Sequence, residues 1–125
     1  LLMRGEVASL LRRSDLFLDM SMYQAFGRTA LEAMACGCTA VVPRLGGAWE
    51  FVVNGVNAKA VDTFAPDEAV EAIAALAADR ERLRSYQAAA CRTAARYSVD
   101  RAALSEYLLF SFEHARRLES ARATV

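Results

Sequence analysis

The stretch SMYQAFGRTALEAMACG, residues 21–37, decides the predicted fold. It predicts a loop that turns at Phe26-Gly27 and leads directly into a helix ending at Gly37, because a glycine just past a helix end commonly forms a left-handed cap. The helix is apolar almost all round, which is typical of a buried helix. Glu32 lies in its middle, and a buried carboxylate is costly unless a partner pairs with it. We therefore expect Glu32 to be buried and paired.

Short apolar runs flank this stretch. Residues 16–18, LFL, are typical of a short buried strand. Residues 39–43, TAVVP, predict a second strand that stops at Pro43, which cannot donate to a ladder. Strand, loop, helix and strand in this order predict a βαβ unit with parallel strands and a right-handed crossover. Residues 6–13, EVASLLRR, predict a short amphipathic helix before it.

The segment that follows the second strand has two interpretations. Residues 48–53, AWEFVV, fit a short helix capped by Asn54-Gly55, and they equally fit the first arm of a hairpin turning at that pair. Residues 56–61 alternate between apolar and polar side chains and predict a strand in either case.

From residue 63 to residue 125 the chain is predicted to be mostly helical. Pro66 suits the first position of a helix. The apolar stripe expected on this helix consists of Ala69, Val70, Ile73, Leu76 and Ala77. A further helix is expected over residues 80–97, and Ser98 is expected to cap a last helix. The predicted fold class is α/β, with about three parallel strands, helices between them and a helical C-terminal tail.

Composition narrows the classes of function. The 125 residues carry a formal net charge of zero, so no basic footprint points to nucleic acid. The apolar runs are far shorter than the roughly 20 residues that span a bilayer, and no signal peptide is recognisable. Three cysteines, two of them at the closely spaced positions Cys36 and Cys38, suit a reducing cytoplasm. The chain opens at Leu1 without an initiator Met, so we expect a piece of a larger protein.

Glu32 has two interpretations on spacing alone, and they carry equal weight. It can form a salt bridge with Arg28, one helical turn earlier. Alternatively, it can accept two hydrogen bonds from a vicinal diol such as a ribose. The second interpretation follows from position, because open α/β sheets bind ligands beyond the carboxyl ends of their strands. Gln24 and Phe26-Gly27 also lie there, at a helix N-terminus that can bind phosphate.

The other candidates have plainer interpretations. Gly46-Gly47 is the equivalent loop of the next unit and is more often a simple turn than a ligand contact. Trp49 is more often packing than a stacking platform. Cys36 and Cys38 lack the second pair of ligands that a zinc site needs and are expected in the core. His114 is expected at the surface, and without a nearby nucleophile it offers no catalytic pair.

Several motifs in this order resemble a known family. They are residues 14–21 (SDLFLDMS), 24–37 (QAFGRTALEAMACG), 41–50 (VVPRLGGAWE) and 54–58 (NGVNA). Together they resemble the C-terminal, donor-binding domain of retaining GT-B glycosyltransferases of family 4, also called group 1. The resemblance covers nearly the whole chain and implies the second half of a Rossmann-like three-layer domain, a single partial domain over residues 1–125.

The resemblance implies roles for individual residues. In this family two glutamates with seven residues between them hold the nucleotide sugar, and the second of them, which holds the ribose, matches Glu32. The first contacts the transferred sugar, and Gln24 occupies that position. The resemblance implies that Ala25, Phe26-Gly27 and Arg28 contact the sugar and the diphosphate of the donor. The resemblance also implies a short helix at residues 48–53, and neither a metal nor a cofactor besides the nucleotide-sugar substrate.

The same resemblance implies what lies outside the chain. The basic residues that neutralise the diphosphate, and the separate N-terminal domain that binds a glycan or lipid-linked acceptor, are expected before Leu1. The fragment is therefore expected to be inactive alone. The full enzyme is expected in the cytoplasm, at the inner face of the membrane. The uncovered edge of strand 16–18 is expected to pair in a homodimer, and Phe110 and Phe112 to remain exposed.

Two alternatives stay open. One is a non-catalytic α/β interaction module, in which Glu32 is merely paired with Arg28. The other is a sugar-nucleotide epimerase or hydrolase on the same fold.

Overall fold

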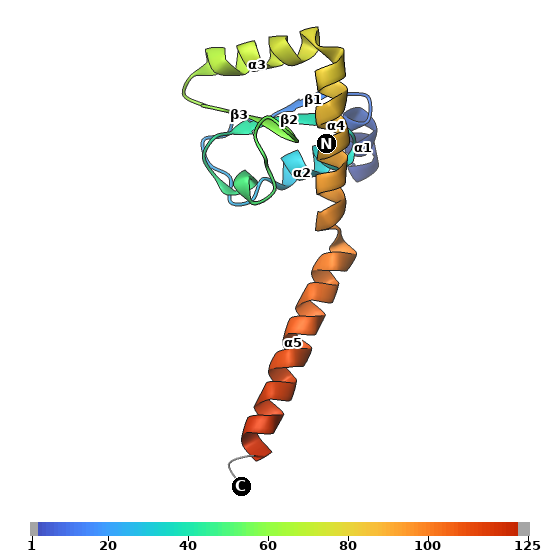
Figure 1. The fold of residues 1–125 in the computed structure, drawn as a ribbon. Helices are drawn as coiled ribbons and strands as arrows, with labels where there is room; N and C mark the ends of the chain where they lie inside the picture. Colours follow the sequence, from blue (N-terminus) through green and yellow to red (C-terminus); the bar gives the residue numbers. More distant parts are fainter. Residues whose placement is uncertain (1–2, 123–125) are drawn as a thin grey trace. The chain divides into compact units, whose positions relative to one another are not determined.

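The computed structural model describes residues 3–122 and confirms the α/β class (Figure 1). Its elements are α1 (Arg4–Leu11), β1 (Leu16–Leu18), α2 (Arg28–Ala35), β2 (Thr39–Pro43), the 3₁₀ helix η1 (Gly47–Glu50), β3 (Ala58–Val61), α3 (Pro66–Ala78), α4 (Arg80–Ala94), the 3₁₀ helix η2 (Ala95–Tyr97) and α5 (Val99–Arg122). Contacts divide the chain into two compact units, Leu1–Ala95 and Arg96–Val125, which are described separately. The assignment of residues 1–125 to one partial domain stays a prediction.

The described strands form one parallel sheet in the order β1-β2-β3. Leu16 pairs with Thr39 between β1 and β2, and Ala40 pairs with Ala58 between β2 and β3. The predicted βαβ unit is therefore confirmed, with β2 at the centre of the sheet and β1 at an edge.

Helices cover both faces of the sheet, which gives the three layers that the resemblance implied. All five residues of β2 are buried, as expected for a central parallel strand. Ala40 and Val42 point to the face where α2 and the end of α4 pack. Val41 points to the opposite face, where it packs with α3 and the start of α4. Figure 1 shows α2 and α3 on opposite sides of the strands.

The ambiguous segment before β3 starts as a short helix that ends at Glu50, earlier than predicted, and the hairpin interpretation is wrong. It forms η1, and β2 and β3 run parallel. The strand begins at Ala58 and not at residue 56, because Asn57 is buried in the preceding turn. Its side chain accepts a hydrogen bond from Val53 N at 2.7 Å and donates to Phe51 O at 2.8 Å and to Thr93 Oγ1 at 2.9 Å.

Two helices differ from prediction, α3 in the residues that it buries and α1 in its ends. Pro66 is the first residue of α3 as predicted, but the buried positions are Ala69, Ala72 and Leu76, while Val70 and Ala77 are exposed. Helix α1 begins and ends two residues earlier than predicted and buries none of its residues within the described chain. Its apolar side chains therefore contribute little to the core of this unit.

The second unit contains α5, which Ser98 caps as predicted, since Arg101 N donates to Ser98 Oγ at 3.3 Å. Phe110 and Phe112 are exposed, again as predicted, and so are Leu104, Tyr107 and Leu108. Among the described residues, no helix is both long and apolar enough to cross a bilayer.

Candidate functional site

The loop that follows β1 is fixed at its start by Asp19. The backbone N–H of Asp19 donates to Val41 O at 2.9 Å, so the loop leaves the sheet in a defined direction. Asp19 is only 9% exposed. Its Oδ1 accepts a hydrogen bond from Ser21 N at 2.9 Å, and its Oδ2 accepts one from Gln24 Nε2 at 2.7 Å. Sequence reasoning did not single out Asp19, although an aspartate two residues before a serine at a strand end is a recognisable turn signal.

The loop after β2 packs directly on the loop after β1. Gly47 N donates to Gln24 O at 2.7 Å. A Cβ added at Gly47 would lie 1.8 Å from Ala25 O, so only glycine permits this approach. The preceding Gly46 has a φ of +118°, in the range that favours glycine. Gly46-Gly47 is therefore more than a simple turn, because it brings the loops of two neighbouring strands together at the carboxyl edge of the sheet.

Helix α2 begins at this junction. Its N-cap is Gly27, with a φ of +85°, and a Cβ there would lie 3.2 Å from Ala48 Cβ. The Phe26 ring lies 5.5 Å from the Phe51 ring, which ties the loop to the core. The first turn of a helix leaves N–H groups without intrahelical partners, and the helix dipole makes this end positive. The N-terminus of α2 is thus placed where an anion can bind.

Glu32 is exposed, so the expectation that it is buried is wrong. Helix α2 buries Ala30, Ala33 and Met34 against the sheet, and Glu32 lies on the other face. Arg28 Nη2 and Glu32 Oε1 are 3.7 Å apart, and the two side chains are 77% and 58% exposed. An exposed pair at this distance contributes little to stability. The Glu32 carboxylate therefore pairs with Arg28 and is at the same time accessible to a ligand.

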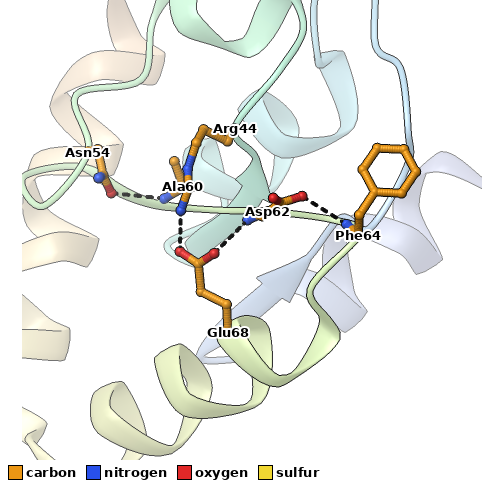
Figure 2. A network of polar contacts seen from close by, with 6 residues as sticks. All are labelled: Arg44, Asn54, Ala60, Asp62, Phe64 and Glu68. Carbon is orange, nitrogen blue, oxygen red and sulfur yellow. Dashed lines mark hydrogen bonds and ion pairs between the residues drawn. The ribbon is translucent and has the colours of Figure 1, made fainter.

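A second polar network follows β2 and β3 (Figure 2). Arg44 donates to Glu68 Oε1 at 2.5 Å, and Glu68 Oε2 accepts a hydrogen bond from Asp62 N at 3.0 Å. Asp62 Oδ1 in turn accepts one from Phe64 N at 2.9 Å. Trp49 Nε1 donates to the carbonyl of Arg44. Arg44 and Trp49 are thus anchored by contacts within the chain, and this network ties α3 to the ends of two strands.

Asn54 completes the picture in Figure 2. Its Oδ1 accepts a hydrogen bond from Ala60 N at 2.9 Å, which holds the turn before β3 against the strand.

The burial of Cys38 and the exposure of His114 agree with the prediction, but the burial of Cys36 does not. Cys38 is buried in the core as predicted, whereas Cys36 is only half-buried. Burial raises the pKa of the Cys38 thiol, whose Sγ donates to Leu11 O at 3.2 Å. His114 is exposed on α5, as predicted. Among the described residues, no group of three His, Cys, Asp or Glu side chains is arranged to hold a metal ion.

Comparisons with known proteins agree on one family. The family described as "Glycosyl transferases group 1" matches residues 2–93. A D-inositol 3-phosphate glycosyltransferase of Segniliparus rotundus is 36% identical over 113 residues, which are 90% of this chain and 25% of that protein. The chain therefore spans about a quarter of the length of this relative.

Two solved structures share the fold. Sucrose-phosphate synthase from Thermosynechococcus elongatus superposes with a TM-score of 0.81 at 23% identity, over 88% of this chain and 28% of that one. HepE from Anabaena, in complex with UDP and glucose, superposes with a TM-score of 0.74 at 27% identity, over 84% of this chain and 30% of that one.

Proposed function

The chain belongs to the group 1 glycosyltransferases, and from this premise we propose that its full-length protein is a retaining glycosyltransferase. It transfers a hexose from a nucleoside diphosphate sugar to a glycan or lipid-linked acceptor. One observation carries the proposal: the loops after β1 and β2 meet at the N-terminus of α2, with the exposed carboxylate of Glu32 one turn further along. This is the carboxyl edge of the sheet, where ligands of open α/β domains bind.

The diphosphate is assigned to the N-terminus of α2. The backbone N–H groups of Gly27 and Arg28 then face the diphosphate, and the positive end of the helix dipole favours the negative charge of the diphosphate. The Arg28 side chain is 77% exposed and adds a mobile cation. During transfer, negative charge grows on the leaving diphosphate, and donors already in place stabilise that charge without reorganisation. We assign no resident cofactor or metal to this site, since the nucleotide sugar is itself the substrate.

The ribose is assigned to Glu32. A carboxylate can accept two hydrogen bonds from the 2′- and 3′-hydroxyls of a ribose. The 3.7 Å contact with Arg28 is long enough to yield to such a ligand. The transferred sugar then lies over Gln24 and Ala25, next to Gly46-Gly47. The complex of HepE with UDP and glucose supports a donor of this class.

The wider setting of the reaction is also part of the proposal. The acceptor site belongs to a separate domain of the full-length protein, which works on the cytoplasmic side, peripheral to the membrane. The three free cysteines suit a reducing compartment. We also propose that the edge strand β1, whose Leu18 is 46% exposed, pairs with another strand, as in a homodimer.

Calorimetric titration of the full-length protein tests the donor assignment. Four nucleoside diphosphates (UDP, GDP, ADP and dTDP) and one nucleotide sugar derived from each are titrated into the unmodified protein and into Glu32→Ala. Loss of two hydrogen bonds to a charged carboxylate is expected to weaken nucleotide binding about 10- to 100-fold. Glu71→Ala, which removes an exposed carboxylate on α3, is the matched control and should bind normally.

Three results would contradict the proposal in different ways. Unchanged affinity in Glu32→Ala would exclude the ribose role. No binding of any nucleotide by the unmodified protein would favour a non-catalytic interaction module. Rapid release of free nucleotide without an acceptor would favour a hydrolase or an epimerase on the same fold.

A further inference from the structure

Asp19 and Gln24 form a partly buried pair beside the proposed sugar position. Asp19 follows β1 and is anchored to the sheet through its backbone N–H, which donates to Val41 O. Asp19 as a residue is 9% exposed, while Gln24 is half-buried. Gln24 Nε2 lies 2.7 Å from Asp19 Oδ2. The loop backbone at Gln24 is also fixed, because its carbonyl accepts a hydrogen bond from Gly47 N. The pair is therefore held from both sides.

The chemistry of the pair determines which end of the Gln24 amide faces outward. A carboxylate can only accept hydrogen bonds, so it requires the NH₂ group of Gln24 and repels its oxygen. Within the described part of the chain, no residue donates a hydrogen bond to Gln24 Oε1. The amide thus leaves its acceptor oxygen free on the side away from Asp19.

We propose that Asp19 is a positioning residue for the donor sugar: it orients the Gln24 side chain so that Gln24 Oε1 accepts a hydrogen bond from a hydroxyl of the transferred sugar. The inference rests on the proposed function, since it names the sugar-recognising atom of that same site. It also makes positions 19 and 24 chemically dependent on each other. A glutamate at position 24 would bring a second carboxylate against Asp19, and two carboxylates that close repel each other.

Exchanging the charges of the pair provides the test. In Asp19→Asn, the asparagine oxygen can still accept the hydrogen bond from Ser21 N, so its NH₂ group faces Gln24. Gln24 must then turn its oxygen inward and present a donor to the sugar. In the double variant Asp19→Asn/Gln24→Glu, the asparagine NH₂ group donates to the new carboxylate, and an acceptor oxygen faces the sugar again.

The measurement compares free diphosphates with their sugars in the full-length protein. UDP and UDP-glucose, and GDP and GDP-mannose, are titrated into each variant. Asp19→Asn and Gln24→Glu alone are each expected to weaken the binding of the sugar nucleotide about five- to tenfold, the value of one neutral hydrogen bond. The affinity for the free diphosphate should stay within twofold of the unmodified protein. The double variant should recover most of the lost affinity for the sugar nucleotide.

Asp62→Asn is the matched control, because Asp62 also follows a strand and its Oδ1 accepts a hydrogen bond two residues on, from Phe64 N at 2.9 Å. It should change neither affinity. The inference is overturned if the double variant binds the sugar nucleotide no better than the single variants, or if Asp19→Asn loses nothing. Loss of free-diphosphate binding in Asp19→Asn alone would indicate a disturbed loop, and recovery in the double variant then still decides in favour of the pair.

Failure of the proposed function gives a different result. In that case the unmodified protein binds neither the free diphosphates nor their sugars, and the inference fails with it.

Discussion

Gly47 approaches Ala25 so closely that a Cβ on Gly47 would lie 1.8 Å from the Ala25 carbonyl oxygen. Gly47→Ala must therefore push the two loops apart. We expect a loss of about 1–3 kcal/mol in the free energy of unfolding, the usual cost of overpacking. The separation also moves Gln24, whose carbonyl bonds Gly47 N, so sugar-nucleotide affinity should fall as well. Urea denaturation measures the stability change, and calorimetric titration measures the affinity change.

Gly5→Ala is the control for this substitution. Gly5 lies within α1, and a Cβ there meets nothing within 4 Å. Because Gly5 lies in the first turn of the helix, alanine there is expected to stabilise by at most about 0.5–1 kcal/mol, the gain over glycine in a helix interior. Equal urea midpoints for Gly47→Ala and the unmodified protein would mean that the two loops are not in tight contact.

Asn57 is the most heavily bonded buried side chain among those described. It is 3% exposed and makes three hydrogen bonds, to Val53 N, Phe51 O and Thr93 Oγ1. Asn57→Ala removes all three hydrogen bonds from a buried position, so we expect the free energy of unfolding to fall by about 2–4 kcal/mol. Urea unfolding followed by circular dichroism provides the measurement.

Asn54→Ala gives the comparison, because Asn54 is exposed and its side chain accepts one hydrogen bond from the described residues, that of Ala60 N. Its loss should cost about 1 kcal/mol. Equal losses for the two asparagines would show that burial of the Asn57 network adds nothing.

Elements whose boundaries are set by neighbouring residues are predictable from the sequence, and elements whose boundaries depend on distant contacts are not. The β1-α2-β2 unit was predictable because residues at the ends of its elements set their boundaries. Gly37, with its left-handed backbone, caps helix α2, and Pro43 ends strand β2. The start of β3 was not predictable, because it depends on Asn57 bonding Thr93, 36 residues away. No periodicity within the strand reports such a contact.

The candidate site shows the same limit. Glu32 was expected to be buried because its helix is apolar almost all round, but alanine tolerates either face, and the buried residues of α2 are Ala30, Ala33 and Met34. Gln24 was identified by its place in a motif. Its pairing with Asp19 depends on the path of the loop between them, which composition and spacing do not reveal.

Asp15 links the first unit's sheet to α4 through a pH-sensitive contact. Its carboxylate accepts hydrogen bonds from Arg80 Nη1 at 2.8 Å and Gln87 Nε2 at 3.4 Å, which lower the pKa of Asp15 below its ordinary value of 3.8. A pKa lowered by folding means that the contact stabilises the protein above pH 3.8 and is lost as the pH falls through the lower, folded-state value. Because the pair is largely exposed, its contribution is at most about 1 kcal/mol.

Asp15→Asn should therefore lower the urea midpoint slightly at pH 7, and the difference should disappear as the pH falls below 3.8. Urea titrations at a series of pH values follow this change. A difference that grew toward acid pH would contradict the assignment.

Cys38 should be the least reactive of the three thiols. It is fully buried at the start of β2, and burial raises its pKa, so the reactive thiolate is scarce at neutral pH. Cys91 is exposed and should react first with an aromatic disulfide reagent, followed by the half-buried Cys36. In Cys91→Ser the fast phase should vanish, while in Cys38→Ser all phases of the native protein should remain. If Cys38 reacted as fast as Cys91 without denaturant, the start of β2 would have to open far more readily than its complete burial implies.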